Sequence, residues 1–339
     1  MSEVVYLIGA GASYGQRGIK KETGETLEGC IIRGLPIVNQ LEPAIEWYCK
    51  TIQKKGSMGQ HVDDSEYPTL YKELKWLKSK CQTYPTIDTF AKKLTVTHNW
   101  LELERLKNAL TAFFALIQSH EKRDLRYDGL VASIIQDDGS LPKNVSILSW
   151  NYDYQIEYVL QDFSPVKSSI LHVWQNQGVT CKGFRSFIDN SRFNCVKLNG
   201  TAMFSFTSGN ELIDPNIYDL PTIEKWYSDD FDRYKSSISF AWEKDDTFID
   251  SILPLVSDAK VLVVIGYSFP YVNRAVDRKL VQNMTSLRSV YIQDMAASDV
   301  KQSFETLLSE NQQKGVAQQI IRIHSRTSVA QFIIPNELT

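Results

Sequence analysis

The sequence lacks the cysteine and histidine patterns that mark disulfide-rich and metal-binding proteins. It has five cysteines, an odd number with no Cys-x-x-Cys pair: Cys30, Cys49, Cys81, Cys181 and Cys195. A disulfide framework and a structural zinc site are therefore not expected. The five histidines show no metal-ligand spacing with one another either. The chain is expected to be a reduced, cytoplasmic protein without a bound metal.

Long hydrophobic runs and a dense basic stripe are also missing. The longest strongly apolar run, Val261–Ile265, is far too short to span a bilayer. A core-like strand begins almost at the N-terminus, so no signal peptide is expected. Charge is balanced, with 37 basic and 40 acidic residues and a net charge of −3. This balance argues against nucleic acid as a direct ligand, because a phosphate backbone needs clustered Lys and Arg.

Short apolar runs bounded by turn signals recur along the 339 residues of the chain. They lie at residues 4–8, 145–150, 195–198, 261–265, 290–292 and 320–323. Runs of this length and composition are typical of buried parallel strands. Segments whose apolar residues recur at helical spacing lie between most of these runs. The sequence therefore predicts the α/β class, with a doubly wound, Rossmann-like parallel sheet.

The stretch from about residue 40 to residue 144 shows helical patterns and no evident strand. Apolar residues there recur every three to four positions, as at Leu103, Leu106, Leu110, Phe113 and Ile117. Stripes of this kind are most often core packing. The sequence thus predicts a single domain over residues 1–339, with a helical block inserted at residues 40–144.

A glycine-rich loop follows the first predicted strand directly. It consists of Gly9, Ala10, Gly11, Ala12 and Ser13. Glycines let the backbone turn tightly and approach a pyrophosphate, whose charge is met by main-chain N–H groups. A Gly-x-Gly turn is also common at strand-to-helix corners for purely steric reasons, so this motif alone is a weak indicator. Further on, Pro36 suits the first turn of a helix.

Polar and glycine residues also follow the later strands, at the edge where ligands bind in open parallel sheets. They are Asn151 and Asp153 after 145–148, Asn199 and Gly200 after 195–198, Gly266 and Ser268 after 261–265, and Asp294 after 290–292. Each has a plain explanation as a helix cap or a turn. Their shared order and placement favour one ligand site at this edge, with Asp294 placed to accept hydrogen bonds from ribose hydroxyls.

Taken together, these segments resemble the sirtuin-like domain of bacterial NAD-hydrolysing antiphage proteins, including the effector of the Thoeris system. That family has a Gly-Ala-Gly-x-Ser loop, a Gly-(Leu/Ile)-Pro element, an Asn-x-Asp segment, a His-Gly pair and a Gly-(Tyr/Thr)-Ser segment. The corresponding residues here are 9–13, 34–36, 151–153, 199–200 and 266–268. The resemblance spans residues 3 to about 295, and its motifs are specific as a set and weak singly.

The resemblance implies an NAD+ glycohydrolase that cleaves the nicotinamide–ribose bond, as an effector of an antiphage system. Asn151, Asp153 and Asn199 would be catalytic, with the Asn151 side chain facing solvent in a cleft. NAD, as substrate, would contact Gly9, Ala10, Gly11, Ala12, Ser13, Pro36, Gly200, Gly266, Ser268 and Asp294. Activation would come from a partner protein or a homo-oligomer, with neither nucleic acid nor a membrane as a direct partner.

Two departures from related proteins bear on the mechanism. Protein-deacylating sirtuins carry a four-cysteine zinc ribbon, which this chain cannot build, so the resemblance points to the zinc-free hydrolases. Asn199 stands where the family has its catalytic histidine, and losing a general base typically costs about 10²–10⁴ in rate. Water can capture an oxocarbenium-like cation with limited help from a base, so Asn199 would only orient the reacting groups. The alternative is a catalytically weak or inactive nucleotide-binding subunit that works with a partner.

A nicotinamide dehydrogenase is the rival enzyme class. It would carry an acidic residue about 20 positions after the glycines, to hold the ribose. Residues 29–34 contain no acid. Tyr71 and Lys75 form a Tyr-x-x-x-Lys pattern, but on an amphipathic helix without pocket elements. His172 lies between the Asn151 and Asn199 segments, within reach of the expected pocket, but a lone histidine in an apolar run is more often a core residue.

Overall fold

The computed structural model describes most of the chain, in two compact units. The described residues are 2–14, 34–55, 61–120, 124–164, 169–183, 188–209, 211–228, 231–243 and 246–338. The first unit comprises Met1–Ser13, Asp124–Gly200 and Ser239–Thr339. The second comprises Tyr14–Arg123 and Thr201–Ile238.

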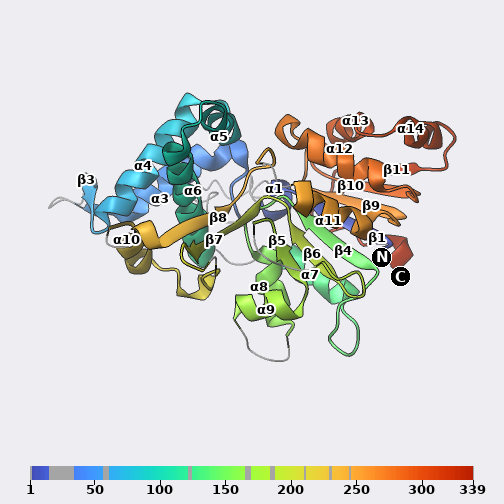
Figure 1. The fold of residues 1–339 in the computed structure, drawn as a ribbon, viewed down its shortest axis with the longest axis horizontal. Helices are drawn as coiled ribbons and strands as arrows, with labels where there is room; N and C mark the ends of the chain where they lie inside the picture. The colour runs from blue at the N-terminus through green and yellow to red at the C-terminus, as the bar shows by residue number, and fades with distance from the viewer. Residues whose placement is uncertain are drawn as a thin grey trace. The chain divides into compact units, whose positions relative to one another are not determined.

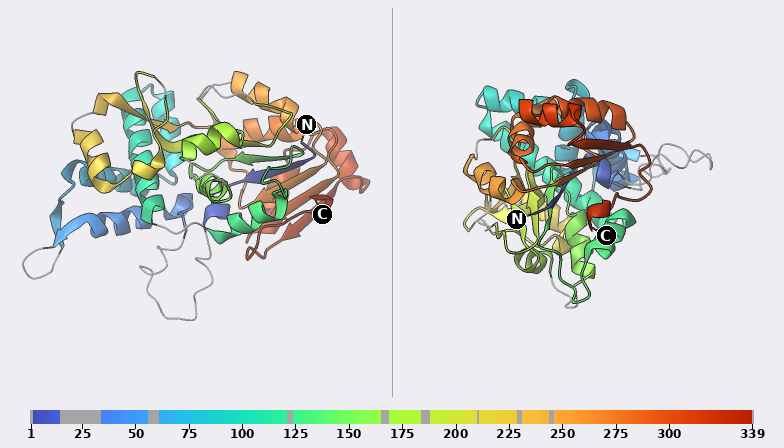
Figure 2. Two further views of the ribbon diagram at one scale, coloured as in Figure 1. Left: turned by 90° about the horizontal axis from the view of Figure 1, so that it is seen from below. Right: turned by 90° about the vertical axis from the view of Figure 1, so that its right-hand side faces the viewer.

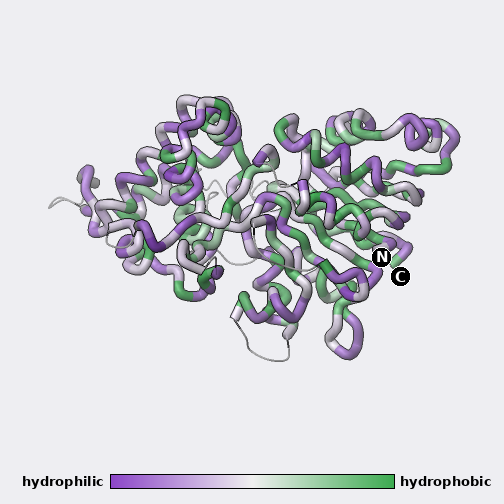
Figure 3. Tube along the Cα trace, viewed as in Figure 1, coloured by the Kyte–Doolittle hydropathy of each residue, from purple (hydrophilic) through white to green (hydrophobic). Residues whose placement is uncertain are grey.

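The first unit is built on a seven-stranded parallel sheet in the order β11-β10-β9-β1-β4-β6-β5 (Figure 1). Its strands are β1 Val4–Ile8, β4 Val145–Ser149, β5 Val179–Cys181, β6 Asn194–Lys197, β9 Val261–Ile265, β10 Ser289–Gln293 and β11 Arg322–Arg326. Every residue of β1, β4 and β9 is buried. Such apolar, β-branched strands are typical of a parallel sheet covered on both faces, and Figure 3 shows hydrophobic residues along them.

Helices cover both faces of this sheet (Figure 2). The helices of this unit are α7 Leu125–Ile134, α8 Gln155–Asp162, α9 Ile170–Asn176, α11 Asp246–Val256, α12 Arg274–Asn283, α13 Ala297–Glu305 and α14 Glu310–Ala317, together with the single turn α1 Ala10–Ser13 within the glycine loop. On one face, Leu7 and Val264 share a hydrophobic core with Ile252, Leu280 and Phe304 of α11, α12 and α13. The α/β, doubly wound, Rossmann-like architecture predicted from the sequence is confirmed.

The strand order of the sheet reverses at β1. One neighbour is β4, and the other is β9, which the chain reaches only after passing through β5 and β6. The loops that leave β1 and β9 therefore meet at the carboxyl edge, where the amide of Gly11 donates to the carbonyl of Gly266 at 2.9 Å. In open α/β sheets, ligands bind at this kind of reversal point.

The second unit contains helices and two small antiparallel sheets. Its elements are α3 Leu41–Ile52, α4 Pro68–Thr83, α5 Ile87–Val96, α6 Trp100–His120, α10 Leu220–Ser228, and the strand pairs β2 Gln53–Lys55 with β3 His61–Ser65 and β7 Gly200–Phe206 with β8 Tyr234–Ile238. Short 3-10 helices span Val38–Gln40, Pro215–Ile217 and Phe231–Arg233 here, and Tyr271–Asn273 and Asn336–Leu338 in the first unit. Within the described ranges, no helix is long and apolar enough to cross a membrane.

The second unit differs in two respects from the helical block expected at residues 40–144. A hairpin formed by β2 and β3 lies where no strand was expected. Residues 124–144, including α7, belong to the first unit, and residues 201–238 join the second. Association of distant segments of the chain decides these bounds, and local sequence patterns do not report it.

Candidate functional site

Three glycines allow the loops after β1 and β9 to pack against each other. A Cβ atom on Gly9 would lie 2.6 Å from the Gly266 carbonyl oxygen, and one on Gly11 would lie 2.8 Å from the Gly266 Cα. Gly266 itself has φ of 58°, and a Cβ there would collide with the amide of Ala12. Only glycine tolerates both the conformation and the lack of space. Close packing of two loops is thus sufficient to explain the glycines of this motif.

Three main-chain amides of the glycine loop already donate hydrogen bonds within the protein. The amide of Gly9 donates to Ile265 at 3.0 Å, that of Gly11 to Gly266 at 2.9 Å, and that of Ala12 to Gly9 at 2.9 Å. A pyrophosphate at this loop would need donors other than these three. Binding of a phosphate by main-chain amides of this loop stays a prediction. These hydrogen bonds reduce the number of amides that are available for it.

Asn151 is a buried brace between the end of β4 and the glycine loop. Its side chain is 5% exposed, which contradicts the expectation of a solvent-facing side chain. Its Nδ2 donates to the carbonyl of Gly9 at 3.0 Å and to Oγ of Ser13 at 3.1 Å. Ser13 in turn shares a hydrogen bond of 2.9 Å with the hydroxyl of Tyr127. The side chain of Asn151, which was expected to be catalytic, therefore holds the glycine loop in place.

Asp153 is buried at the start of α8, above a buried ion pair. Its Oδ1 accepts from the amide of Gln155 at 3.2 Å, and its main-chain carbonyl accepts from Nζ of Lys197. Lys197 also lies 3.3 Å from Oε1 of Glu157. Burial raises the pKa of the Glu157 carboxyl, and the charge of Lys197 opposes that rise. Lys197, the last residue of β6, thus holds the turn that contains Asp153.

Asn199 follows β6 and is largely buried. Its Nδ2 donates to the carbonyl of Trp150 at 3.4 Å, and its own carbonyl accepts from the amide of Ser239 at 2.8 Å. Its Oδ1 is buried and has no hydrogen-bond partner among the described residues. Leaving a buried acceptor unpaired costs about 1–3 kcal/mol, so this atom is suited to a donor from a ligand or a water molecule.

The remaining predicted site residues are distributed between the two units. Gly200, with φ of 73°, follows Asn199 directly. Ser268 is exposed after β9, and Asp294 is half-buried after β10. Oδ1 of Asp294 accepts from the amide of Ala296 at 2.8 Å. Pro36 is buried in the second unit, and all the other predicted site residues belong to the first unit.

Two residues of α7 that contact the glycine loop were missed by the sequence analysis. Arg126 is 4% exposed, and its Nη2 donates to the carbonyl of Ala12 at 2.7 Å. The same guanidinium donates to the carbonyl of Val329 at 2.9 Å and pairs with Asp124 at 2.5 Å. Tyr127 contacts Ser13 as described above. Both residues fell inside the expected helical insert, where nothing in the local pattern pointed to the site.

The two histidines described in the first unit, His172 and His324, are exposed. His172, expected in the core, is exposed on α9 and bonds to the side chain of Asn176. His324 is exposed on β11 and stacks on Tyr291 with ring centroids 4.9 Å apart. In the part of the chain that the structure describes, no group of three or more His, Cys, Asp or Glu side chains is arranged to hold a metal.

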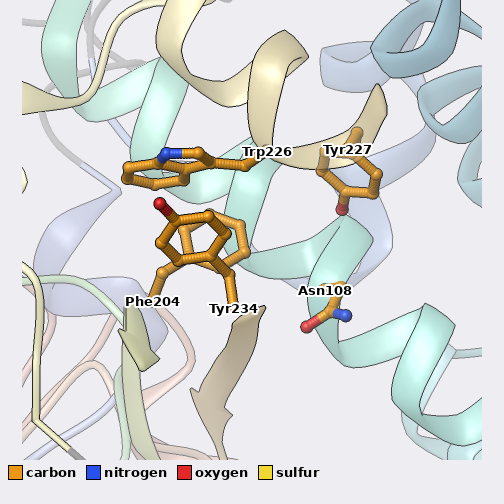
Figure 4. Close-up of a pocket in the computed structure, with 5 residues that line it drawn as sticks. All are labelled: Asn108, Phe204, Trp226, Tyr227 and Tyr234. Atoms are coloured by element: carbon orange, nitrogen blue, oxygen red, sulfur yellow. The ribbon is translucent and has the colours of Figure 1, made fainter. Parts of the chain in front are cut away.

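A separate small hollow lies in the second unit (Figure 4). It is lined by Asn108, Phe204, Trp226, Tyr227 and Tyr234. Its volume is about 10 Å³, which is the space of one water molecule. Trp226 stacks on Tyr234 with centroids 4.6 Å apart. The hollow is part of the packing of an aromatic cluster and is too small for an organic ligand.

No family model matches the chain, and no curated protein matches it. Among solved structures, it is similar to one from work on the structural basis of sirtuin substrate affinity, with 14% identity over 96% of this chain and 89% of that one and a TM-score of 0.39. It is similar to Sir2Tm bound to a propionylated peptide, with 15% identity, coverage of 86% and 81%, and a TM-score of 0.40. A third is Sir2 with a deacetylated p53 peptide and 3'-O-acetyl ADP ribose, with 11% identity, coverage of 94% of each chain and a TM-score of 0.34. With all three TM-scores below 0.5, this likeness assigns neither a family nor an activity.

Proposed function

We propose that this chain binds NAD+ and hydrolyses its nicotinamide–ribose bond, as the effector subunit of a bacterial antiphage system. The proposal draws on the motifs at residues 9–13, 151–153, 199–200 and 266–268. The observation that carries it is the buried Oδ1 of Asn199 at the carboxyl edge of the sheet, which has no hydrogen-bond partner among the residues that the structure describes. An orphaned acceptor at the edge where doubly wound sheets bind nucleotides fits a ligand rich in hydroxyl donors.

The chemistry makes modest demands on the protein. Cleavage expels a leaving group that carries a positive charge before departure and passes through an oxocarbenium-like state, as in glycosidic cleavage. The site must orient the ribose, place negative charge near the developing cation and admit one water molecule. In this proposal the Oδ1 of Asn199 accepts from a ribose hydroxyl or from the attacking water. Asp153 supplies the negative charge, and Lys197 holds its backbone in place.

Asn151 would then act chiefly by holding the loop on which the nucleotide lies. Its side-chain amide donates hydrogen bonds to Gly9 and Ser13, and these bonds hold the backbone that follows β1 in place. The dinucleotide would approach Gly9–Ser13 closely and extend along Gly200, Gly266, Ser268 and Asp294. Pro36 enters the proposal only through its place in the sequence motif.

Release of nicotinamide tests the proposal. The purified chain is incubated with NAD+, alone and with the products of neighbouring genes, and nicotinamide is followed by chromatography. The expected result is release that depends on Asn199 and is unchanged by His172→Ala, an exposed control outside the site. Absence of release under every condition, with NAD+ bound, would reject hydrolysis.

One observation favours a second function, a nucleotide-binding subunit without turnover. Asn199 has no titratable proton, and His172 and His324, the described histidines of the first unit, have exposed side chains. Calorimetry separates the two functions, since a binding subunit would show NAD+ affinity and no nicotinamide even with its partner present. Both versions of the proposal place activation in a partner protein or in self-assembly.

A further inference from the structure

A single buried carboxylate, Asp277, joins the ends of β4 and β9. It lies in the first turn of α12 with an exposed fraction of 0%. The indole Nε1 of Trp150 donates to its Oδ1 at 3.0 Å, and the hydroxyl of Tyr267 donates to its Oδ2 at 2.7 Å. Each carboxylate oxygen thus holds one of the two segments.

On the β4 side, this link reaches two predicted catalytic residues. Trp150 directly precedes Asn151 in the chain. Its carbonyl accepts the hydrogen bond from Nδ2 of Asn199. The position of Trp150 therefore sets the backbone of Asn151 and the orientation of the Asn199 amide.

On the β9 side, the same link reaches the glycine loop. Tyr267 follows Gly266, and its Cδ2 would lie 2.6 Å from a Cβ on Gly9, so its ring packs directly on that residue. The hydroxyl of Tyr267 also accepts from Nδ2 of Asn273 at 3.0 Å. The rings of Trp150 and Tyr267 stack at 6.0 Å with an interplanar angle of 15°. The two aromatic residues and the carboxylate form one unit behind the site.

If this side chain served only for packing, a carboxylate would destabilise the folded protein relative to an apolar side chain. A buried carboxyl group is unfavourable unless its hydrogen bonds are made, and an aliphatic side chain would fill the space without that cost. Burial raises the pKa of Asp277 to about 7, although the hydrogen bonds from Tyr267 and Trp150 and the charge of Arg274 oppose the rise. Perturbed carboxyls of this kind gather at functional sites.

We propose that Asp277 is a positioning residue that fixes the strand ends carrying Asn151 and Gly266 relative to each other. Through Trp150, Asp277 also determines the orientation of the Asn199 side-chain amide. Its role in the reaction rests on the proposed function, and its role in holding the loops does not. The hydrogen-bonded atoms it controls are those of Trp150 and Tyr267, and Asp277 itself need not touch the nucleotide.

Hydrogen exchange of the strand-end amides tests this inference without any need for activity. The amides of Trp150, Asn151 and Gly266 all donate hydrogen bonds in the structure. Asp277→Asn should accelerate their exchange by about tenfold or more, since the amide has one acceptor oxygen for the two donors, Trp150 and Tyr267. The control is Gln312→Met, which removes bonds to the carbonyls of Val281 and Met284 at the other end of α12. It should lower the unfolding midpoint and leave those amides unchanged.

Nucleotide affinity gives the second measurement. Asp277→Asn should weaken NAD+ binding by about tenfold, and Tyr267→Phe should cost clearly less in that background than in the parent chain, because the two changes remove the same bond. Unchanged exchange and affinity in Asp277→Asn, or the same loop effect in Gln312→Met, would overturn the inference. If Asp277→Asn does not fold, Tyr267→Phe and Trp150→Phe each remove one link, and normal exchange in both would overturn it equally.

These results also separate the inference from the proposed function. A parent chain that binds NAD+ without releasing nicotinamide would remove the hydrolase proposal. The exchange rates of the parent, Asp277→Asn and Gln312→Met would still decide the role of Asp277. Conversely, a fully active Asp277→Asn variant with parental exchange rates would sink the positioning role and leave hydrolysis standing.

Discussion

The side-chain amide of Asn151 donates to the carbonyl oxygen of Gly9 at 3.0 Å, across 142 positions of sequence. The same amide nitrogen donates to the hydroxyl of Ser13. Two motifs that lie far apart in the sequence are therefore joined by hydrogen bonds. A substitution at Asn151 therefore also removes hydrogen bonds that hold the glycine loop.

Asn151→Ala should therefore reduce both activity and stability. We expect loss of nicotinamide release, and a fall in the free energy of unfolding on the order of 1–3 kcal/mol, because the carbonyl of Gly9 loses its donor in a buried position. Urea denaturation and a nicotinamide assay on the folded variant measure the two effects. Turnover above about a tenth of the parent rate would show that the catalytic centre lies elsewhere, since such a loss is smaller than removal of a catalytic group normally causes.

Asn199→His should raise NAD+ hydrolysis, or create it where the parent has none. The imidazole restores a titratable group with a pKa of about 6.5 in free solution. The rate should rise with pH as the imidazole loses its proton, because only the neutral ring accepts a proton from water. Rates measured from pH 5 to 9 on the variant and the parent test this.

Two results would count against this assignment of Asn199. An inert Asn199→His variant that binds NAD+ normally would favour the binding subunit. A fast parent enzyme with no change in rate or pH profile on substitution would show that Asn199 does not lie beside the reacting ribose.

Asp277 should make the stability of the protein fall as pH rises through the weakly acidic range. Its pKa is raised to about 7 when folded, against about 3.9 for an unperturbed aspartate. Between these values the folded state binds a proton that the unfolded state has lost, so the contribution is full below about pH 4 and is lost by about pH 7. The size of this effect should be a few kcal/mol.

Asp277→Asn should remove that pH dependence. The free energy of unfolding of parent and variant is compared at intervals from pH 4 to 8. The difference between them should change across the range and level off above about pH 7, where the carboxyl is ionised in both states. A constant difference would mean that Asp277 is already ionised in the folded protein at pH 4.

Arg126→Met should destabilise the protein strongly. It removes the donor to the carbonyl of Ala12 and leaves Asp124 without its buried partner. Breaking a buried pair from one side typically costs about 3–5 kcal/mol. The double change Arg126→Met with Asp124→Asn should recover part of this loss in thermal or urea unfolding. Arg126→Lys should not, because an ammonium group cannot reproduce the bonds of the planar guanidinium. Full rescue by lysine would contradict the geometry described for this residue.

Apolar pattern alone was enough to predict the centre of the fold. The strands β1 (Val-Val-Tyr-Leu-Ile), β4 (Val-Ser-Ile-Leu-Ser) and β9 (Val-Leu-Val-Val-Ile) are mostly apolar, and every residue in them is buried. By contrast, β8 has the sequence Tyr-Lys-Ser-Ser-Ile and β5 is three residues long. Neither shows a clear period of two or a long apolar run, so no local signal distinguished them from loops.

The candidate site was predictable only as far as strand order and strand ends allow. Residues such as Asn199 and Gly266 fall at one edge because parallel strands all end there. The brace made by Asn151 and the link made by Asp277 depend on contacts between segments more than a hundred residues apart. In the sequence, Asp277 is an ordinary charged position in an amphipathic helix, and Arg126 is one more basic residue in a helical stretch.

The close packing of Gly9, Gly11 and Gly266 also limits how this protein can diverge. A Cβ on Gly9 or Gly11 would collide with the backbone of Gly266, and a Cβ on Gly266 would collide with the backbone of Gly11. A larger residue at one of them has no neighbour that can shrink to receive it, since glycine is already the smallest. No single compensating substitution exists among the three. Over evolutionary time the loops after β1 and β9 are thus bound to be inherited together, whatever ligand the descendants come to hold.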